Sequence, residues 1–153
     1  MAKGRWFPLL AAVTLAGCVT VASVPMATSA SDADAKTFRP PEGRADLYVA
    51  RSNGSAGAAG LFDISVDGKL VGPIAPGTFY LVVLDSGRHE ISAATGMNTT
   101  RVTLDADAGR NYFYEVTATS GGFTAKPSLG IVLIEEMGKM MVRQAKRAQG
   151  ASQ

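Results

Sequence analysis

The sequence has very little of the chemistry that marks a disulfide-stabilised domain or a metalloenzyme. Its 153 residues include one cysteine, Cys18, and one histidine, His89. A single cysteine allows no internal disulfide, so the apolar core must hold the fold, which a domain of roughly 100 residues can do. Zinc needs three or four Cys, His or carboxylate ligands. We therefore expect neither a metal site nor a cofactor.

An excess of charge of one sign is also lacking. The chain has 15 Lys and Arg residues against 13 Asp and Glu residues, and loss of Lys3 and Arg5 with a signal segment leaves 13 against 13. A nucleic-acid-binding protein needs a basic face with interleaved aromatic residues, and none is visible. The expected partners therefore do not include nucleic acid.

Helical patterning is missing between the apolar segments of the chain, which disfavours a parallel sheet with crossover helices. The glycine-rich stretch 53–60 is not followed by Lys-Ser or Lys-Thr, and no helix begins after it. It therefore lacks the features of a phosphate-binding loop, and we interpret it as a flexible connection.

The N-terminus carries the clearest signal in the sequence. Two basic residues precede the apolar run 6–16, which is too short to span a bilayer and has the length of a signal segment. The run ends in Leu15-Ala16-Gly17-Cys18, the pattern of a bacterial lipobox. We predict a lipoprotein signal peptide over 1–17, cleavage between Gly17 and Cys18, and acylation of Cys18, since two or three acyl chains hold a protein firmly in a bilayer.

The predicted location is the outer membrane, with the domain facing the periplasm. Val19 and Thr20 follow the cysteine, and neither is the Asp that retains lipoproteins at the inner membrane of enteric bacteria. Two alternatives stay open. Cleavage after Ala30, behind the small residues Thr28 and Ser29, would give a soluble periplasmic protein, and an uncut segment 6–27 would give a single membrane span.

Residues 18–44 are expected to comprise the lipidated Cys18 and a flexible tether. They are rich in Ala, Ser and Asp and end in Arg39-Pro40-Pro41-Glu42-Gly43. A flexible coil of about 26 residues has an r.m.s. reach on the order of 30 Å. Such a tether would set the domain off the membrane surface.

Residues 45–134 carry the pattern of a β domain. Phe62, Ile64 and Val66 alternate with polar residues, which predicts a half-buried strand, and Asp67-Gly68 predicts a hairpin turn. The run 79–84 is apolar on both faces and is expected to be the central, doubly covered strand. The other strand signals lie at 47–49, 69–71, 89–93, 102–104, 112–116 and 129–134. Seven or eight short strands with regular turns predict an all-β, antiparallel sandwich of the Ig-like or prealbumin-like kind.

Residues 135–153 are expected to form a short C-terminal helix and tail. Met137, Met141 and Ala145 fall on one helical stripe, with acidic residues at the start and basic residues at the end, which suits the helix dipole. We interpret this helix as packed on the domain. The alternative is a basic amphipathic surface that contacts anionic lipid head groups.

Aromatic residues provide the candidate ligand or partner surface. They are Tyr80, Tyr112, Phe113 and Tyr114. Period-two alternation puts Tyr112 and Tyr114 on one face and Phe113 on the other. An exposed set would form a platform for an envelope protein or a cell-wall glycan, whereas a buried set would leave only hydroxyl groups at the surface.

No catalytic residues are expected, and we interpret the protein as a binding module rather than an enzyme. His89 follows a turn, where a structural role is typical, and no nucleophile-elbow pattern accompanies it. The alternative from a different class is a small hydrolase that uses His89 with Asp85 and Glu90.

Short motifs in the β domain resemble a known family. They are Val66-Asp67-Gly68, Gly77-Thr78-Phe79-Tyr80, Gly87-Arg88-His89 and Gly109-Arg110-Asn111-Tyr112-Phe113. Their order resembles an uncharacterised family of bacterial envelope lipoproteins, and it is also similar to the PEGA type of surface module. The resemblance implies a lipoprotein with a small β-sandwich of unknown function, and it implies no catalytic residues.

Overall fold

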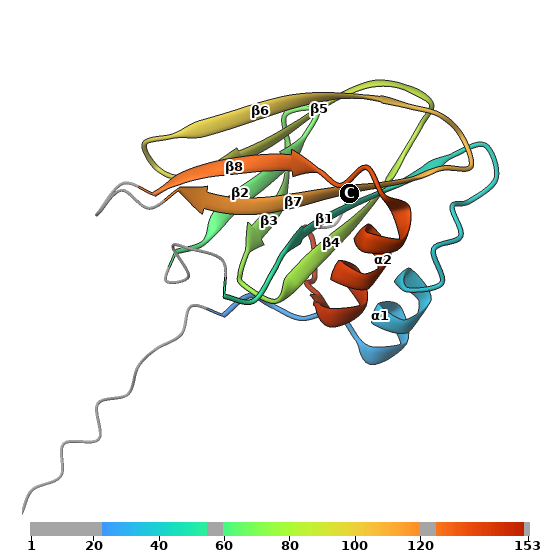
Figure 1. Ribbon diagram of the computed structural model, residues 1–153, viewed down its shortest axis with the longest axis horizontal. Helices are drawn as coiled ribbons and strands as arrows, with labels where there is room; N and C mark the ends of the chain where they lie inside the picture. Colours follow the sequence, from blue (N-terminus) through green and yellow to red (C-terminus); the bar gives the residue numbers. More distant parts are fainter. Residues whose placement is uncertain (1–22, 55–59, 120–124, 152–153) are drawn as a thin grey trace, which may run out of the picture.

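The structure is a computed structural model that describes residues 23–54, 60–119 and 125–151. Nine strands and two helices lie in these ranges: α1 Ser29–Ala35, β1 Ala45–Arg51, β2 Phe62–Val66, β3 Lys69–Ile74, β4 Thr78–Leu84, β5 Gly87–Ala94, β6 Thr99–Ala106, β7 Asn111–Thr119, β8 Lys126–Ile131, α2 Glu135–Gln144 and β9 Lys146–Arg147. The strands form a five-stranded sheet, in the order β8-β7-β1-β4-β9, and a four-stranded sheet, in the order β3-β2-β5-β6. The predicted all-β sandwich with a short C-terminal helix is therefore confirmed (Figure 1).

The four-stranded sheet follows the alternation in its sequence. Phe62, Ile64 and Val66 of β2 point into the core between the two sheets, and the residues between them face outward. Asp67 and Gly68 both have positive φ, at 50° and 75°. Positive φ at both central positions gives the turn a twist that matches the strands of a hairpin. The predicted hairpin between β2 and β3 is present.

The five-stranded sheet is built around β1, in which every residue is buried. Leu47 and Val49 face the core between the sheets, and Tyr48 and Ala50 face a second core beneath the helices. The sequence predicted that 79–84 would be the doubly covered strand. That expectation is wrong for part of β4, because the helices cover Phe79 but leave Val83 exposed.

The second core lies between the outer face of this sheet and the two helices. Phe38, which follows α1, stands 5.3 Å from Tyr48 between ring centroids, and Tyr48 stacks on Phe113 of β7 at 5.1 Å. Val142 of α2 completes the packing. Figure 1 shows α1 and α2 together on this side of the sandwich, away from β5 and β6. The helices thus form a third layer rather than a separate unit.

The sandwich is not antiparallel throughout. β1 pairs with β4 in the antiparallel sense and with β7 in the parallel sense. Between β1 and β7 the chain builds the four-stranded sheet and β4, and this long crossover lets β7 return in the same direction as β1. β9 also runs parallel to β4.

The tether expected over residues 18–44 is corrected by the structure. Val24 is buried in the main core. Met26 forms a β-bridge with Ala148, the Ala27 amide donates to the Arg147 carbonyl at 3.0 Å, and the Gln149 amide donates to the Pro25 carbonyl at 2.8 Å. Residues 24–44 therefore belong to the domain, while 18–22 lie outside the described residues.

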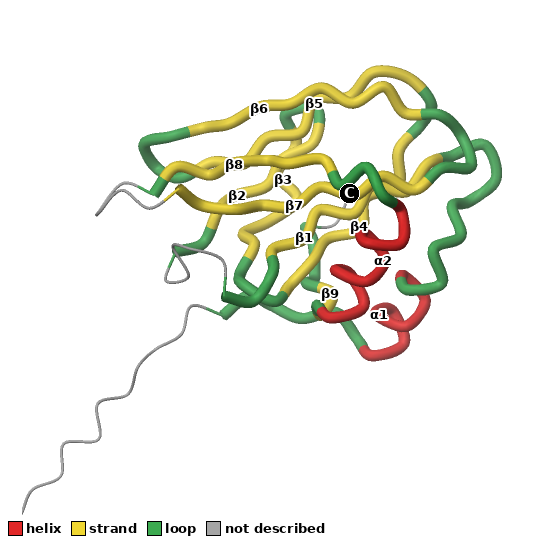
Figure 2. Tube along the Cα trace, viewed as in Figure 1, coloured by secondary structure: helices red, strands yellow, loops and turns green. Residues whose placement is uncertain are grey.

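Local sequence patterns could not reveal this segment. α1 has seven residues, and the Thr28 side chain caps it by accepting a hydrogen bond from the Ser31 amide at 3.2 Å. A helix of two turns shows no sustained period. Residues 25–27 pair with residues 147–149, which continue from β9 at the far end of the sequence, beside the β4 edge (Figure 2).

The C-terminal helix is shorter than the sequence predicts, because α2 ends at Gln144, before Ala145 of the predicted helical stripe. Lys146 and Arg147 instead pair with Thr78 and Phe79 of β4. Ala145 and Ala148 are buried as part of this extended segment.

A substitution at Gly138 of α2 tests how tightly the helix packs on the sheet. A methyl group at this position would overlap the ring of Phe113. We expect Gly138→Ala to lower the free energy of unfolding by about 1–3 kcal/mol, the usual cost of overpacking, as measured by urea denaturation. If the contact between α2 and Phe113 were loose, the same substitution would raise the free energy of unfolding, since alanine favours an exposed helix by about 1 kcal/mol over glycine.

The matched control is Gly130→Ala in β8. No atom lies within 4 Å of the added methyl group there, and the glycine has no positive φ. This variant should unfold close to wild type. Equal destabilisation of both variants would contradict the packing shown for Gly138.

Candidate functional site

The predicted aromatic platform is not formed. Tyr80, Phe113 and Tyr114 are buried and Tyr112 is half-buried. The predicted alternation is present: Tyr112 and Tyr114 pack on the core between the sheets, and Phe113 packs beneath the helices. The Tyr80 hydroxyl donates to the Pro73 carbonyl at 2.8 Å. These rings pack in the two cores, which is the alternative that the sequence left open to an exposed platform.

Cys18 and Gly17, the predicted lipidation and cleavage residues, lie outside the described residues. Their roles stay predictions. In the part of the chain that is described, no helix is long and apolar enough to cross a membrane.

His89 connects a turn to a strand. Its Nδ1 lies 2.7 Å from Asp67 Oδ2, and its Nε2 lies 2.9 Å from the Asp85 carbonyl oxygen. The other oxygen of Asp67 accepts the Glu90 amide at 2.9 Å. Both ring nitrogens are engaged, so the imidazole joins the β2–β3 turn to β5. It holds this position as a structural link.

The two carboxylates of the hydrolase alternative are each paired with an arginine. Arg44 Nε contacts Asp85 at 2.6 Å, and Arg101 Nε lies 3.5 Å from Glu90. The hydrogen bonds of His89 go to the Asp67 side chain and the Asp85 backbone instead. In the described ranges, no three His, Cys, Asp or Glu side chains lie close enough together to hold a metal ion.

The His89 and Asp67 pair shifts the pKa of both groups. Burial lowers the pKa of His89, but the Asp67 carboxylate and the Asp85 carbonyl favour the charged ring and raise the pKa overall. The hydrogen bond from His89 lowers the pKa of Asp67 against a smaller effect of burial. The charged pair is therefore favoured in the folded state.

A groove of about 360 Å³ is the most chemically distinctive cavity. It lies between the segment after α1 and the outer face of β1 and β4, and its lining includes Asp34, Arg39, Asp46, Val83 and Arg147. Asp46 is only 3% exposed. In the described structure its Oδ1 has no hydrogen-bond partner, and its Oδ2 lies 3.4 Å from the Tyr48 hydroxyl.

Asp46 Oδ1 is therefore a buried acceptor whose hydrogen-bonding capacity is unused within the described structure. Burial raises its pKa, and the Tyr48 hydroxyl only partly offsets this effect. Arg147 at the same groove is held in place, because its Nη1 donates to the Ser31 carbonyl at 3.0 Å and to the Ser31 hydroxyl at 2.7 Å. No local sequence pattern indicates this groove, since its walls come from segments far apart in the chain.

A second surface lies on α2 and the connection before it. We name it the α2 apolar face. Its four residues are exposed, at 84% for Leu133, 61% for Ile134 and 52% each for Met137 and Met140. The sequence predicted that Met137 and Met141 would pack inward. Met141 is partly buried against the second core, as predicted. The prediction is wrong for Met137, because Gly138 and Val142 face the sheet and Gly138 lets the helix approach Phe113 closely.

The charged residues of α2 form ion pairs with one another or lie over the Phe38 ring. Lys139 forms ion pairs with Glu135 at 2.9 Å and with Glu136 at 3.2 Å. Arg143 lies over the Phe38 ring, at 5.3 Å from the guanidinium carbon to the ring centroid. α2 is thus an amphipathic helix that shows part of its apolar side to solvent.

Comparisons with known proteins find relatives without an assigned function. The family described as protein of unknown function (DUF2846) matches residues 41–128. A protein of Haemophilus influenzae (strain ATCC 51907 / DSM 11121 / KW20 / Rd), named only as an uncharacterized protein, is 32% identical over 126 residues, which cover 82% of this chain and 73% of its own. No solved structure matches the chain. The lipid anchor and the likeness to PEGA modules stay predictions.

Replacing His89 with Gln should lower stability in a pH-dependent manner. The pKa of His89 is raised from 6.5 in the folded state, so the stabilisation is complete below about pH 6.5 and is lost as the pH rises through the folded value. Because the pKa of Asp67 is lowered, the contribution of its carboxylate to stability is present above about pH 3.8. We expect a loss of up to about 1 kcal/mol between these limits, shrinking at higher pH.

The test is urea denaturation of wild type and His89→Gln at about pH 5.5 and about pH 8.5. The two proteins should differ more in free energy of unfolding at the lower pH. The neighbouring Arg88→Gln, at an exposed position, is the control and should show no such change. A difference that grows with pH would contradict a charged pair.

Asp46→Asn should stabilise the protein at neutral pH. Because burial raises the pKa of Asp46, the ionised carboxylate opposes folding above that pKa, and the penalty disappears as the pH falls through it. The neutral amide should add on the order of 1 kcal/mol to the free energy of unfolding near pH 7 and little in acid. Asp105→Asn, at an exposed position of β6, serves as the control. Destabilisation of Asp46→Asn at neutral pH would contradict this account.

Proposed function

Because the chain belongs to the DUF2846 family of proteins of unknown function, we propose its function from its own sequence and fold. The protein is a bacterial envelope lipoprotein, anchored through acylated Cys18, and its β-sandwich is a non-catalytic binding module. The observation that carries this proposal is the position of the lipobox relative to the start of the fold.

The start of the fold supports cleavage before Cys18 over cleavage after Ala30. Val24 packs in the main core, and the backbones of Pro25 and Ala27 bond to the C-terminal segment. Cleavage after Ala30 would remove all of these contacts and the Thr28 cap of α1. Cleavage between Gly17 and Cys18 leaves every described residue in the mature chain.

The same contacts oppose an uncut span over residues 6–27. Residues 25–27 pair with residues 147–149, and Val24 packs in the main core, so they are not available to form a helix in the bilayer. Five residues, 19–23, would separate the acylated cysteine from Val24.

The geometry of the polar groups favours binding over catalysis. Both nitrogens of His89 are engaged in structural contacts. The Asp46 groove offers a buried acceptor at its floor and two arginines in its lining. It suits a ligand with amino or hydroxyl donors, which an envelope protein or a cell-wall glycan could supply. The outer membrane is the proposed location, on the basis of Val19 and Thr20.

The intact mass of the protein extracted from bacterial membranes tests the anchor. We expect a mature chain that begins at Cys18 and carries added diacylglycerol and acyl mass. Cys18→Ser should lose the lipid mass, because the hydroxyl is a far weaker nucleophile than the thiolate. Thr20→Ala, two residues away, should be processed and acylated as wild type is.

Two results would overturn the proposal. A chain that begins at Ser31 without lipid would indicate a soluble periplasmic protein. A chain that keeps residues 1–17 would indicate an uncleaved membrane segment.

A further inference from the structure

The link between the anchor and the domain is too short to hold the domain away from the bilayer. Extended chain covers at most about 3.6 Å per residue, so Cys18 and Ser23 stand no more than about 18 Å apart. A tether of 26 residues would have allowed the domain to stand free. With five residues, the point where the chain enters the domain lies within about 18 Å of the lipid surface.

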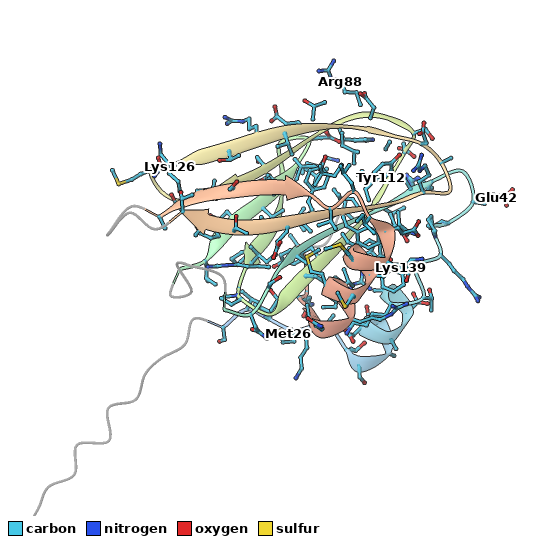
Figure 3. All side chains as sticks on the ribbon, in the orientation of Figure 1. Met26, Glu42, Arg88, Tyr112, Lys126 and Lys139 are labelled. Carbon is cyan, nitrogen blue, oxygen red and sulfur yellow. The ribbon has the colours of Figure 1, made fainter. Side chains whose placement is uncertain are left out.

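The point where the chain enters the fold selects the face of the domain that lies nearest the lipid. Ser23 and Met26 line one cavity together with Gln144 and Lys146, so the chain enters beside the C-terminal end of α2. Figure 3 shows Met26 at the lower edge of the molecule, next to the helices, and Arg88 at the opposite edge. The α2 apolar face begins one turn from Gln144, at Met140, and continues along the helix to Leu133.

We propose that the α2 apolar face lies on the anionic lipid surface of the membrane that holds the anchor. This inference rests on the proposed function, because it needs the acylated Cys18. Leu133, Ile134, Met137 and Met140 enter the boundary between head groups and acyl chains, with the helix axis in the plane of the bilayer. Met26, which is also exposed, lies at the same edge.

The charges of this region fit the surface of an anionic bilayer. Arg143 and Lys146 are exposed at the end of α2 where the chain enters, and basic residues beside a membrane attract anionic lipids. The acidic residues of the helix, Glu135 and Glu136, are both paired with Lys139. One lysine against two glutamates leaves the first turn of the helix with a net charge of −1, so the positive charge lies only at the anchored end.

Four exposed apolar side chains are sufficient because the acylated Cys18 supplies most of the membrane affinity. A free amphipathic helix must supply the whole membrane affinity from its own buried area. Here the covalent anchor keeps the face at a high effective concentration beside the bilayer, so even weak contacts are populated. The four large apolar side chains then set the orientation of the domain on the bilayer, whereas the anchor attaches the domain to it.

Methionine oxidation of the wild-type lipoprotein tests this orientation without any substitution in the face. The purified lipidated protein, its mass verified, is reconstituted into vesicles of phosphatidylethanolamine and phosphatidylglycerol and treated with hydrogen peroxide. Met137 and Met140 should oxidise at least about threefold more slowly than in the unlipidated Cys18→Ser protein, because the side chains lie about 5–10 Å into the interface. Met97, 80% exposed between β5 and β6 of the other sheet, should oxidise at the same rate in both.

A tryptophan experiment separates lipid from a second copy of the chain. Trp6 is the only tryptophan and precedes Cys18, so the mature lipoprotein has none. With lipids brominated along the acyl chain, we expect quenching of about twofold or more for Leu133→Trp and Met140→Trp. Met97→Trp should not be quenched. Circular dichroism and urea unfolding confirm that each variant folds.

Each other outcome overturns the inference in a distinguishable manner. Lack of lipid on the purified protein would remove the proposed function and this inference together. Lipidated protein with unprotected Met137 and Met140, or with no quenching at Leu133 and Met140, would overturn the orientation alone. Protection that depends on protein concentration, without quenching by the brominated lipid, would assign the face to self-association.

Discussion

The whole structure depends on the burial of β1 on both of its faces. Leu47 and Val49 hold the two sheets together, and Tyr48 and Ala50 hold the helical layer on the same strand. The Tyr48 hydroxyl donates to the Ala35 carbonyl at 2.7 Å. Burial and the neighbouring Asp46 raise the pKa of Tyr48, so this donor stays protonated. One strand thus fixes both cores, and loss of either layer would expose it.

The last residue of β1 is the largest buried polar group in the described structure. Arg51 donates from Nη1 to the Gly60 carbonyl at 2.5 Å and lies 4.5 Å above the Phe62 ring, measured from the guanidinium carbon to the centroid. Removing an arginine from water is costly unless it gains such partners. It therefore ties the end of the central strand to the start of β2, where the chain passes from one sheet to the other.

Much of the fold was predictable from the sequence, because most of its strands alternate. Phe62, Ile64 and Val66 indicated one face of β2, Asp67-Gly68 indicated the hairpin, and the stretch 112–116 indicated β7. The parts that were missed depend on pairing between distant segments, such as Met26 with Ala148, which no local period encodes. The candidate site was missed for related reasons. The tyrosines that suggested a platform are the residues that fill the core, and the Asp46 groove exists only after three distant segments come together.

The pairing of the two ends of the domain has a consequence for its place in the envelope. Because residues 24–28 cover the edge beside β9, the chain leaves the fold from a fixed position rather than from a long tether, and an anchor a few residues away becomes a constraint on orientation. In the orientation proposed above, the α2 apolar face contacts lipid and the four-stranded sheet faces the periplasm. The outward side of that sheet is polar, with Asp63, Glu90 and Arg101 exposed, and its edge strand β6 alternates exposed polar residues along its length. Polar edges resist unspecific strand pairing, so a partner that approached this sheet would have to recognise its side chains rather than extend it.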